Sequence, residues 1–498
     1  MYLLPITLLC YLLGAGSTLG LGIMYEQYAF FALGLSLAII WWSDRKWLAW
    51  VSLLIGTVTP FIIYDFALNS GAGTLLQKTP FFTLLPLIVF TCWTKVSRVF
   101  AALICVFLLY GVFGNHVPSP FTGANLDTFT FLTLMTHDRE AILGVPFMVT
   151  ITTVFAFVLF GRTMQMGGIG DYLNNIAFSL FGKSRGGPAK VAVISSGLFG
   201  SFSGSAVANV ITTGTITIPA MIKSGYKKST AAALEAMSST LGQVLPPVMG
   251  ASAFIMAELT QLEYLDVAQF ALIPGVVSYI CLFMIVHFLG KKVDYGHIDK
   301  LNYLQSWKYV VPVSVLIFLA LRFFPIDVAA VIASVIAIVT CRITFPSIKL
   351  LTEQLAQDMS ILIVIAAACG FIISTLDQTG LAFTLSYLLT NMADSSLLFV
   401  LCMTALISII LGMGMPTASA YIVVAMLIAP SLIELGIEPL KAHMFVLYFS
   451  VLSMVTPPVA LASFAAANIA KADPMKTALK ATAFGLPMMI LPFIWIYM

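Results

Sequence analysis

Two short stretches of small and polar residues interrupt an otherwise apolar chain. The first, GLFGSFSGSAVANV at residues 197–210, should break a helix, and a second half-helix is expected to begin near Ser205. The second, GMGMPT at residues 412–417, places Pro416 at the first position of the next expected helix, where proline is favoured. Helix N-termini carry free N–H groups and positive partial charge, so they suit a carboxylate or another oxyanion. Both tips are therefore predicted to bind an anion.

The expected anion contacts are backbone, hydroxyl and amide groups around these two tips. They are Ser201, Ser203, Gly204, Ser205, Asn209, Gly414, Pro416, Thr417 and Ser419. A structural alternative stays open, because glycine and serine also allow membrane helices to approach closely. No Lys or Arg is expected at this depth, so helix ends or bound cations would have to balance the charge of the anion.

A double proline follows each tip, in STLGQVLPPVMGAS (residues 239–252) and SVLSMVTPPVALAS (residues 450–463). Proline removes an N–H and clashes with the preceding turn, so each helix should break and leave carbonyls without helical partners. These carbonyls and nearby hydroxyls, with the tips, could hold a sodium ion. The expected ion-coupling residues are Ser238, Ser239, Gln243, Pro246, Pro247, Gly412, Ser453, Thr456, Pro457, Pro458 and Glu235. Kinks repaired by neighbouring Ser, Thr or water are the alternative.

Glu235, in TAAALEAMSS, is the only acid well inside an expected crossing helix. An unpaired charge at this depth is costly, so the carboxyl group must be paired or protonated. It could carry a proton or link moving parts, or it could meet a structural partner on a neighbouring helix. No cofactor, disulfide framework or dedicated metal centre is indicated, because the seven cysteines and five histidines are scattered.

The elements that must position these groups are helices in a lipid bilayer. The 498-residue chain is 60% hydrophobic and 9% charged, whereas a soluble domain has about 25% charged residues. Repeated apolar runs approach the roughly 20 residues that a helix needs to cross a bilayer, and lipid favours helices because they satisfy their own backbone groups. We expect an all-α integral membrane protein, with no domain large enough to bind nucleic acid.

The positive residues orient these helices. Thirteen crossings are expected, among them 3–23, 28–42, 47–67, 141–160 and 358–377. With the N-terminus in the cytoplasm and the C-terminus on the opposite side, 20 of the 24 Lys and Arg residues lie inside, as the positive-inside rule requires. Residues 191–222 must then begin and end on the same side, which makes them a re-entrant hairpin.

The chain repeats this arrangement. A gap-free shift of 211 positions aligns residues 201–258 with the second half at 13 of 58 identical positions, including Pro219 with Pro430 and Gly225 with Gly436. The second hairpin, at about 397–433, opens to the opposite side from the first. Inverted repeats with a binding site near the midplane are typical of secondary transporters, whereas a single hairpin would also fit a channel.

Four long motifs resemble a known family. They are GKSRGGPAKVAVISSGLFGSFSGSAVANVITTGTITIPAM, EAMSSTLGQVLPPVMGASAFIMAE, LGMGMPTASAYIVVA and VTPPVALASFAAANIAKADPMKTA. Over at least residues 141–498 the chain resembles the membrane permease of a TRAP (tripartite ATP-independent periplasmic) transporter, specifically the fused type of the TAXI branch. The segment FGRTMQMGG departs from the family pattern, and its Arg162 is expected on the cytoplasmic side, away from the central site.

The resemblance implies an elevator-type transporter, in which a transport domain that holds both hairpins slides against a scaffold. Residues 1–80 would correspond to a fused small subunit and residues 81–498 to the large permease domain, with repeats at about 141–290 and 350–498. The resemblance also implies a periplasmic binding protein of the TAXI type and coupling to a sodium or proton gradient. The tips and breaks named above would form the substrate and ion sites.

The expected function is secondary active uptake of an organic anion, such as a C4 or C5 dicarboxylate, across a bacterial or archaeal cytoplasmic membrane. We expect no enzyme activity, and no P-loop motif indicates ATP hydrolysis. One alternative is a cation-coupled anion transporter of the same architecture that needs no binding protein. A second is an ion channel or a structural membrane subunit.

Overall fold

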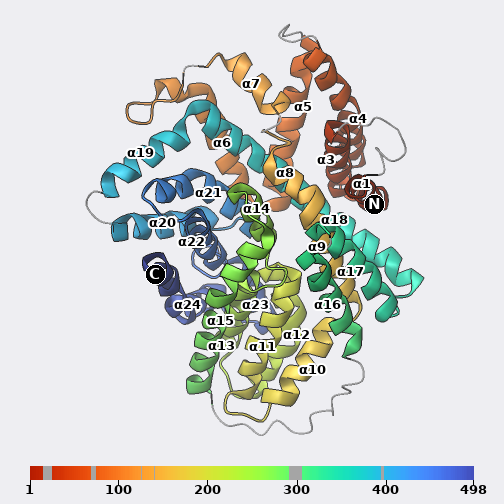
Figure 1. Cartoon of the computed structure of the whole chain (residues 1–498), viewed down its shortest axis with the longest axis vertical. Helices are drawn as coiled ribbons and strands as arrows, with labels where there is room; N and C mark the ends of the chain where they lie inside the picture. The colour runs from red at the N-terminus through yellow and green to blue at the C-terminus, as the bar shows by residue number, and fades with distance from the viewer. Residues whose placement is uncertain are drawn as a thin grey trace.

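A bundle of helices makes up the chain. The computed structural model describes residues 1–14, 25–68, 75–124, 126–138, 141–290, 306–322, 324–393 and 397–498, and every regular element within these ranges is a helix (Figure 1). Six helical segments in the described part are long and apolar enough to cross a membrane: Arg98–His116, Val145–Met166, Tyr264–Leu289, Phe345–Thr379, Thr417–Glu434 and Pro474–Tyr497. The all-α membrane fold expected from composition is thus confirmed.

The N-terminal part contains α1 (Leu3–Leu12), α3 (Tyr25–Trp41), α4 (Lys46–Leu68) and α5 (Leu75–Thr91). Helices α3 and α4 touch through glycine backbones, since a Cβ atom on Gly34 would lie 2.6 Å from the Cα atom of Gly56. The second half of the expected crossing 3–23 lies outside the described residues. Residue 80, the expected domain boundary, falls inside α5.

The next part of the chain leads into the first repeat, which is expected to begin at about residue 141. Its segments are η1 (Cys92–Val96), α6 (Arg98–Phe113), η2 (Gly114–His116), α7 (Thr128–His137), α8 (Val145–Val149), η3 (Thr150–Val154), α9 (Phe155–Met166) and α10 (Ile169–Phe181). Helices α7 and α10 occupy segments that sequence reasoning left as loops. The continuous segment from α8 to α9 ends at Met166, six residues beyond the expected end at 160.

The first hairpin consists of α11 (Gly187–Ser203) and α12 (Ala206–Lys223). It leads into α13 (Lys228–Leu241), the short turn η4 (Gly242–Val244), α14 (Ala251–Thr260) and α15 (Tyr264–Leu289). The helix therefore breaks at the first double proline, as proline chemistry predicts.

The second half follows α16 (Trp307–Arg322), α17 (Ile326–Thr340) and α18 (Phe345–Thr379). It contains α19 (Leu381–Ala393), α20 (Leu397–Gly412), α21 (Thr417–Glu434), α22 (Pro439–Leu452), α23 (Leu461–Ala470) and α24 (Pro474–Tyr497). Helices α12 and α13 recur as α21 and α22, each with the same length and 211 positions later. The backbone thus carries the same offset as the sequence repeat.

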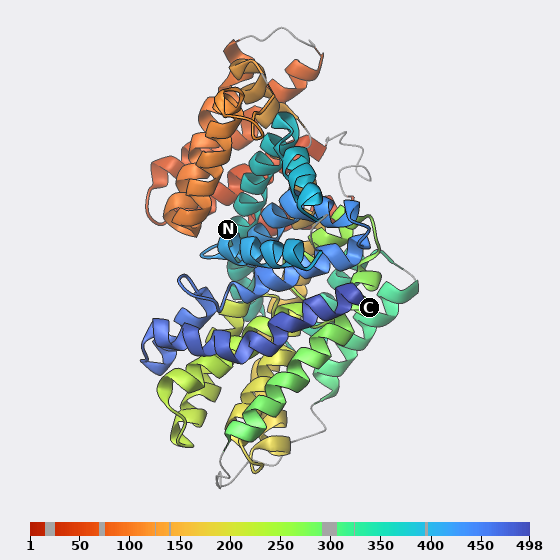
Figure 2. The same ribbon diagram turned by 90° about the vertical axis from the view of Figure 1, so that its left-hand side faces the viewer.

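Helix α18 joins the parts of the molecule. It has 35 residues, and 89% of an apolar stretch of 18 residues within it is buried inside the protein. It contacts α3 and α5 of the N-terminal part, α6, α9 of the first repeat and α21 of the second. Figure 2 shows the N-terminal helices, red and orange, at one end of the molecule and the yellow and green hairpin helices at the other.

Candidate functional site

The first hairpin tip is a sharp turn between two half-helices. Helix α11 ends at Ser203, Gly204 takes a left-handed conformation with φ of 62°, and Ser205 caps α12 by accepting a hydrogen bond from the Ala208 N–H at 3.3 Å. A Cβ atom on Gly204 would lie 2.7 Å from the Met249 carbonyl oxygen, so only glycine fits this turn. The tip therefore presents the N-terminus of α12, as expected.

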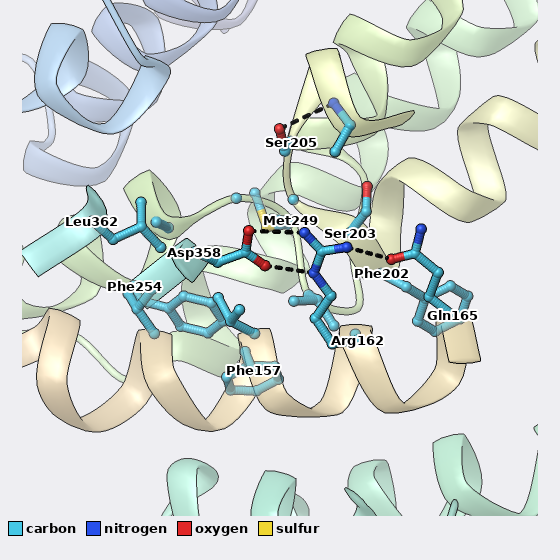
Figure 3. A pocket seen from close by; sticks show the side chains of 18 of the residues that line it. Phe157, Arg162, Gln165, Phe202, Ser203, Ser205, Met249, Phe254, Asp358 and Leu362 are labelled. Atoms are coloured by element: carbon cyan, nitrogen blue, oxygen red, sulfur yellow. Dashed lines mark hydrogen bonds and ion pairs between the residues drawn. The ribbon is translucent and has the colours of Figure 1, made fainter. Parts of the chain in front are cut away.

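A cavity of about 260 Å³ opens beside this tip. One side of its wall is Ser203, Gly204 and Ser205, the opposite side is α9, and Asp358 of α18 closes one edge (Figure 3). Residues 248–251, which follow the double proline, complete the wall. The cavity therefore lies where the tip, the first helix break and α18 meet.

An ion pair crosses this cavity. The Arg162 guanidinium donates to both oxygens of Asp358, with Nε to Oδ2 at 2.5 Å and Nη2 to Oδ1 at 2.8 Å, and its Nη1 donates to the Gln165 Oε1 atom at 3.0 Å. Figure 3 shows Arg162 reaching from α9 between these two partners. The side chains of Arg162 and Asp358 are 26% and 30% exposed, so water or a ligand can reach both. The expectation that Arg162 lies away from the central site is wrong.

Sequence reasoning missed this pair because it misplaced two helix ends. The expected crossing 141–160 stops before Arg162, and the expected crossing 358–377 starts at Asp358. In the structure both residues lie inside helices. The Arg162 guanidinium and the Asp358 carboxylate therefore lie beside the first tip. Expecting no basic residue beside the tips was therefore also wrong. The signal was an arginine immediately beyond the apolar run.

Ser203 has a free hydroxyl group. Its Oγ atom is buried and has no hydrogen-bond partner among the described residues, although it lines the cavity. Ser201, two residues earlier, donates to the Leu198 carbonyl at 2.8 Å and is buried. Buried polar groups are nearly always hydrogen-bonded, so the unpartnered Ser203 hydroxyl beside the cavity is a candidate partner for a bound ligand or water.

One side chain connects the two tips. Gln243, in the first helix break, donates from Nε2 to the Gly204 carbonyl at 3.0 Å and accepts at Oε1 from the Thr417 hydroxyl at 3.1 Å. Thr417 is the first residue of α21, with Pro416 before it as the N-cap. The structure therefore brings three predicted site residues together: one from the first tip, one from the first break and one from the second tip.

The second tip has tighter surroundings. Gly414 is left-handed with φ of 73°, and a Cβ atom on it would lie 3.0 Å from the Val459 side chain. Ser419 donates back to the Pro416 carbonyl at 2.8 Å. Of the nine residues expected to bind the anion, the cavity wall contains Ser203, Gly204 and Ser205. Asn209 is fully buried and donates to the Ser196 carbonyl at 2.7 Å.

Several of the oxygen atoms at the two breaks already have partners. After Pro246 and Pro247, the Tyr264 hydroxyl donates to the carbonyls of Pro247 at 2.9 Å and Val248 at 2.8 Å. Before Pro457 and Pro458, the Thr482 hydroxyl donates to the Val455 carbonyl at 3.2 Å. The hydroxyls of Ser238, Ser453 and Thr456 donate to carbonyls of their own helices. At these oxygen atoms the contacts agree with the alternative interpretation, in which neighbouring groups satisfy the hydrogen bonds that each kink leaves open.

Glu235 lies in a cage of hydroxyl groups. It is fully buried in α13, and Ser196 of α11, Thr213 and Thr217 of α12, and Ser239 of α13 all donate to it. The residues that the structure describes contain no group of three or more His, Cys, Asp or Glu side chains that could hold a metal ion. All seven cysteines are free.

Comparison with known proteins identifies the family. Residues 81–498 match the family described as Tripartite ATP-independent periplasmic transporter, DctM component. The chain belongs to this family of TRAP transporter large permeases. Such permeases are multi-pass proteins of the cytoplasmic membrane that transport small organic anions with a periplasmic substrate-binding protein, and they are not enzymes.

Two relatives and one solved structure show the range of this similarity. The permease is 24% identical to the C4-dicarboxylate large permease DctM of Pseudomonas aeruginosa, over 66% of this chain and 77% of the relative. It is 24% identical to the sialic acid permease SiaT of Haemophilus influenzae, over 67% of this chain and 54% of SiaT. The crystal structure of the Alcanivorax borkumensis YdaH transporter matches 79% of this chain and 97% of its own, with a TM-score of 0.55 at 14% identity. That likeness supports the membrane transporter fold.

Proposed function

We propose that this TRAP permease imports a small organic anion, such as a C4 or C5 dicarboxylate, by secondary active transport. The observation that carries the proposal is the cavity at the first hairpin tip, which is lined by Arg162, by Ser203 and by the N-terminus of α12. A guanidinium group holds a carboxylate with two parallel hydrogen bonds. The helix N-terminus favours an anion at the same point.

The charges around the cavity favour transport of a cation with the anion. Asp358 already neutralises Arg162, so an arriving carboxylate adds a negative charge that the pair does not balance. A sodium ion or a proton taken up elsewhere in the same domain would restore neutrality. We therefore include coupling to a sodium or proton gradient in the proposal.

The wider arrangement extends the proposal. A TAXI-type binding protein would deliver the anion, and residues 1–80 would act as a fused small subunit in the scaffold. The hairpins and breaks would move together as an elevator, with the N-terminus in the cytoplasm and the C-terminus in the periplasm. The Gln243 bridge between the two tips supports their joint movement.

Uptake by the purified permease in proteoliposomes tests the proposal. Labelled succinate is offered with and without the cognate binding protein, under a sodium or a proton gradient. Accumulation that needs the binding protein and one gradient is expected. Accumulation without the binding protein would favour a stand-alone anion transporter, and a current without gradient-driven accumulation would favour a channel.

Two bulky substitutions locate the site. Ser203→Leu fills the cavity wall, and Thr417→Leu removes the hydroxyl that donates to Gln243. Both should abolish uptake while the protein still reaches the membrane. Lys349→Ala, on the same helix as Asp358 and outside the cavity wall, serves as the control. Normal uptake in both leucine variants would contradict the tip assignment.

A further inference from the structure

The hydroxyl cage around Glu235 is a complete hydrogen-bonding site without a basic partner. Its carboxylate accepts from Ser196 at 2.7 Å, Thr213 at 2.6 Å, Thr217 at 2.5 Å and Ser239 at 3.2 Å, and in the described part of the chain these four hydroxyls are its partners. Gly214 leaves room for it, since a Cβ atom there would lie 3.1 Å from the Glu235 Cγ atom. A lone buried carboxyl group without a cation is costly unless it can be protonated.

The second half of the repeat shows that the fold does not need this acid. The 211-residue offset places Thr213, Thr217 and Glu235 at the positions of Val424, Ile428 and Val446. All three equivalents are buried, with exposures of 0%, 3% and 0%. The helices α21 and α22 therefore meet through aliphatic side chains where α12 and α13 meet through a carboxyl group and two hydroxyls. A requirement of packing alone would not explain the difference.

The cage can satisfy the carboxyl group in both protonation states. When Glu235 is ionised, all four hydroxyls donate to it. When its Oε2 atom gains a proton, that O–H can donate to the Thr217 oxygen, and the Thr217 hydroxyl can turn to the Thr213 carbonyl oxygen, 3.1 Å away. Neither state leaves Oε2 or Thr217 unpartnered, so a proton can enter or leave without an orphaned buried group.

The surrounding helices add few charges. On α15, the Tyr279 hydroxyl donates to the Ser238 carbonyl at 2.6 Å. On α24, Lys480 donates to Ser229 and Thr230, at the start of α13. On α22, His443 pairs with the Tyr421 hydroxyl at 2.8 Å. On α11, Lys190 donates to Ser184. None of these groups is bonded to the Glu235 carboxyl.

We infer that the Glu235 cage binds the proton that moves with the transported anion. Three of the four donors come from the two hairpin arms and the acid from α13, so the cage belongs to the same unit as the cavity. Ser196 lies seven residues before Ser203 on α11, about 10 Å along the helix axis. The proton would neutralise the charge that the anion brings. This inference rests on the proposed function for its transport role.

The first test measures proton binding without substrate. Infrared difference spectra of the purified, reconstituted permease are recorded across a pH titration, for the native chain and for Glu235→Gln. A carboxylic-acid C=O band that titrates in the native chain and is missing in the variant is expected. Identical titrations would overturn the inference, whatever the permease transports.

The second test separates coupling from transport. Glutamine keeps an oxygen for Ser196 and an N–H for Thr217, so Glu235→Gln copies the protonated state and should fold. It should lose proton-driven accumulation of labelled succinate at least tenfold, while exchange of succinate across the membrane without a gradient stays within twofold. Retained proton-driven accumulation in the variant, or accumulation by the native permease that needs only sodium, would overturn the inference.

A matched variant uses the residues of the second half. Thr213→Val, Thr217→Ile and Glu235→Val are introduced together, which gives this junction the side chains found at Val424, Ile428 and Val446. The triple variant should melt as the native protein does, exchange succinate and fail to accumulate it under a proton gradient. Loss of exchange in both folded variants would overturn the inference, because the cage would then serve the movement itself. Failure of the native permease to take up any organic anion would instead contradict the proposed function.

Discussion

Each of the two hairpin tips turns through a left-handed glycine, but the turns differ in length and in surroundings. Gly204 and Gly414 are both left-handed, and a helix N-terminus follows each. The first tip faces the cavity with Arg162, whereas Gly414 lies against Val459 and Val99. Features that both tips share are what the fold requires. The Arg162 guanidinium and the unpartnered Ser203 hydroxyl lie at the first tip, which supports the ligand-binding role proposed for this tip.

The two halves also differ where each hairpin crosses its broken helix. In the first half, a Cβ atom on Gly200 would lie 2.7 Å from the Gly242 Cα atom, so two backbones touch. In the second half, Ser453 occupies the position of Gly242, and a Cβ atom on Gly412 would lie 2.4 Å from its Oγ atom. The first crossing is therefore backbone against backbone, and the second is backbone against a side chain.

Among the tests of this comparison, the largest effect is expected from Arg162→Ala, which removes the guanidinium from the first tip and leaves the Asp358 carboxylate without its partner. Removing one partner of a hydrogen-bonded charge pair costs about 2 kcal/mol or more, roughly 30-fold in apparent affinity. Succinate uptake should fall by at least this factor. Arg98→Ala removes an exposed arginine outside the cavity and should leave uptake unchanged. Equal uptake by both variants would show that Arg162 does not give the first tip a role in transport.

Gly200→Ala tests the backbone crossing. The added methyl group meets the Gly242 backbone and the Asn209 amide, both at 2.7 Å, and such overpacking costs about 1–3 kcal/mol. A lower melting temperature in detergent and weaker uptake are expected. Gly114→Ala is the control, because its Cβ atom would make ordinary contact at 3.4 Å. Equal melting temperatures of the two variants would show that the backbones at Gly200 and Gly242 can move apart without loss of stability.

Thr417→Val tests the bridge between the tips. Valine keeps the shape of threonine and removes the hydroxyl that donates to Gln243, so the Gln243 Oε1 atom loses a partner at a cost of about 1 kcal/mol. Uptake should decrease several-fold with a small loss of thermal stability. Ser419→Ala removes a hydroxyl that serves only its own helix end and should have less effect. If Ser419→Ala reduced uptake more than Thr417→Val, the Gln243–Thr417 hydrogen bond would not be the link between the two halves.

The smallest effect is expected outside both halves, at the exposed pair of Lys95 and Asp44. The Lys95 ammonium and the Ser43 hydroxyl lower the pKa of the Asp44 carboxyl. A lowered folded-state pKa stabilises the protein above the unfolded-state pKa, and this contribution disappears as the pH falls through the folded value. Exposed pairs contribute little, so Asp44→Asn should barely change the melting temperature at neutral pH. A large change would show that this pair matters more than its exposure indicates.

Glycine and proline made the backbone of the site predictable. The helix breaks, the start of α12 directly after Ser205 and the offset of 211 residues follow from local chemistry, because these residue types restrict the chain wherever they occur. The position of Pro416 was one residue off, since it caps α21 instead of starting it. Such small errors at helix ends are ordinary.

Contacts between distant residues were not predictable in the same way. Arg162 and Asp358 are 196 positions apart, and their meeting depends on how α9 and α18 cross. The Gln243 bridge to Thr417 spans 174 positions. The search for apolar runs also missed α10 and α19. Short helices with a polar face resemble loops when only the hydropathy along the sequence is considered.

The glycine crossing at Gly200 and Gly242 has a consequence for how substrate preference can change. It fixes the hairpin to the broken helix through main-chain atoms, so almost any side chain there would push the parts of the binding site away from one another. The facing wall on α9 contains side chains such as Phe157 and Val158, which project from one helix surface. New substrates should therefore be reached by exchanging side chains of α9 while the crossing stays glycine. Selection experiments for altered uptake should recover substitutions in that wall.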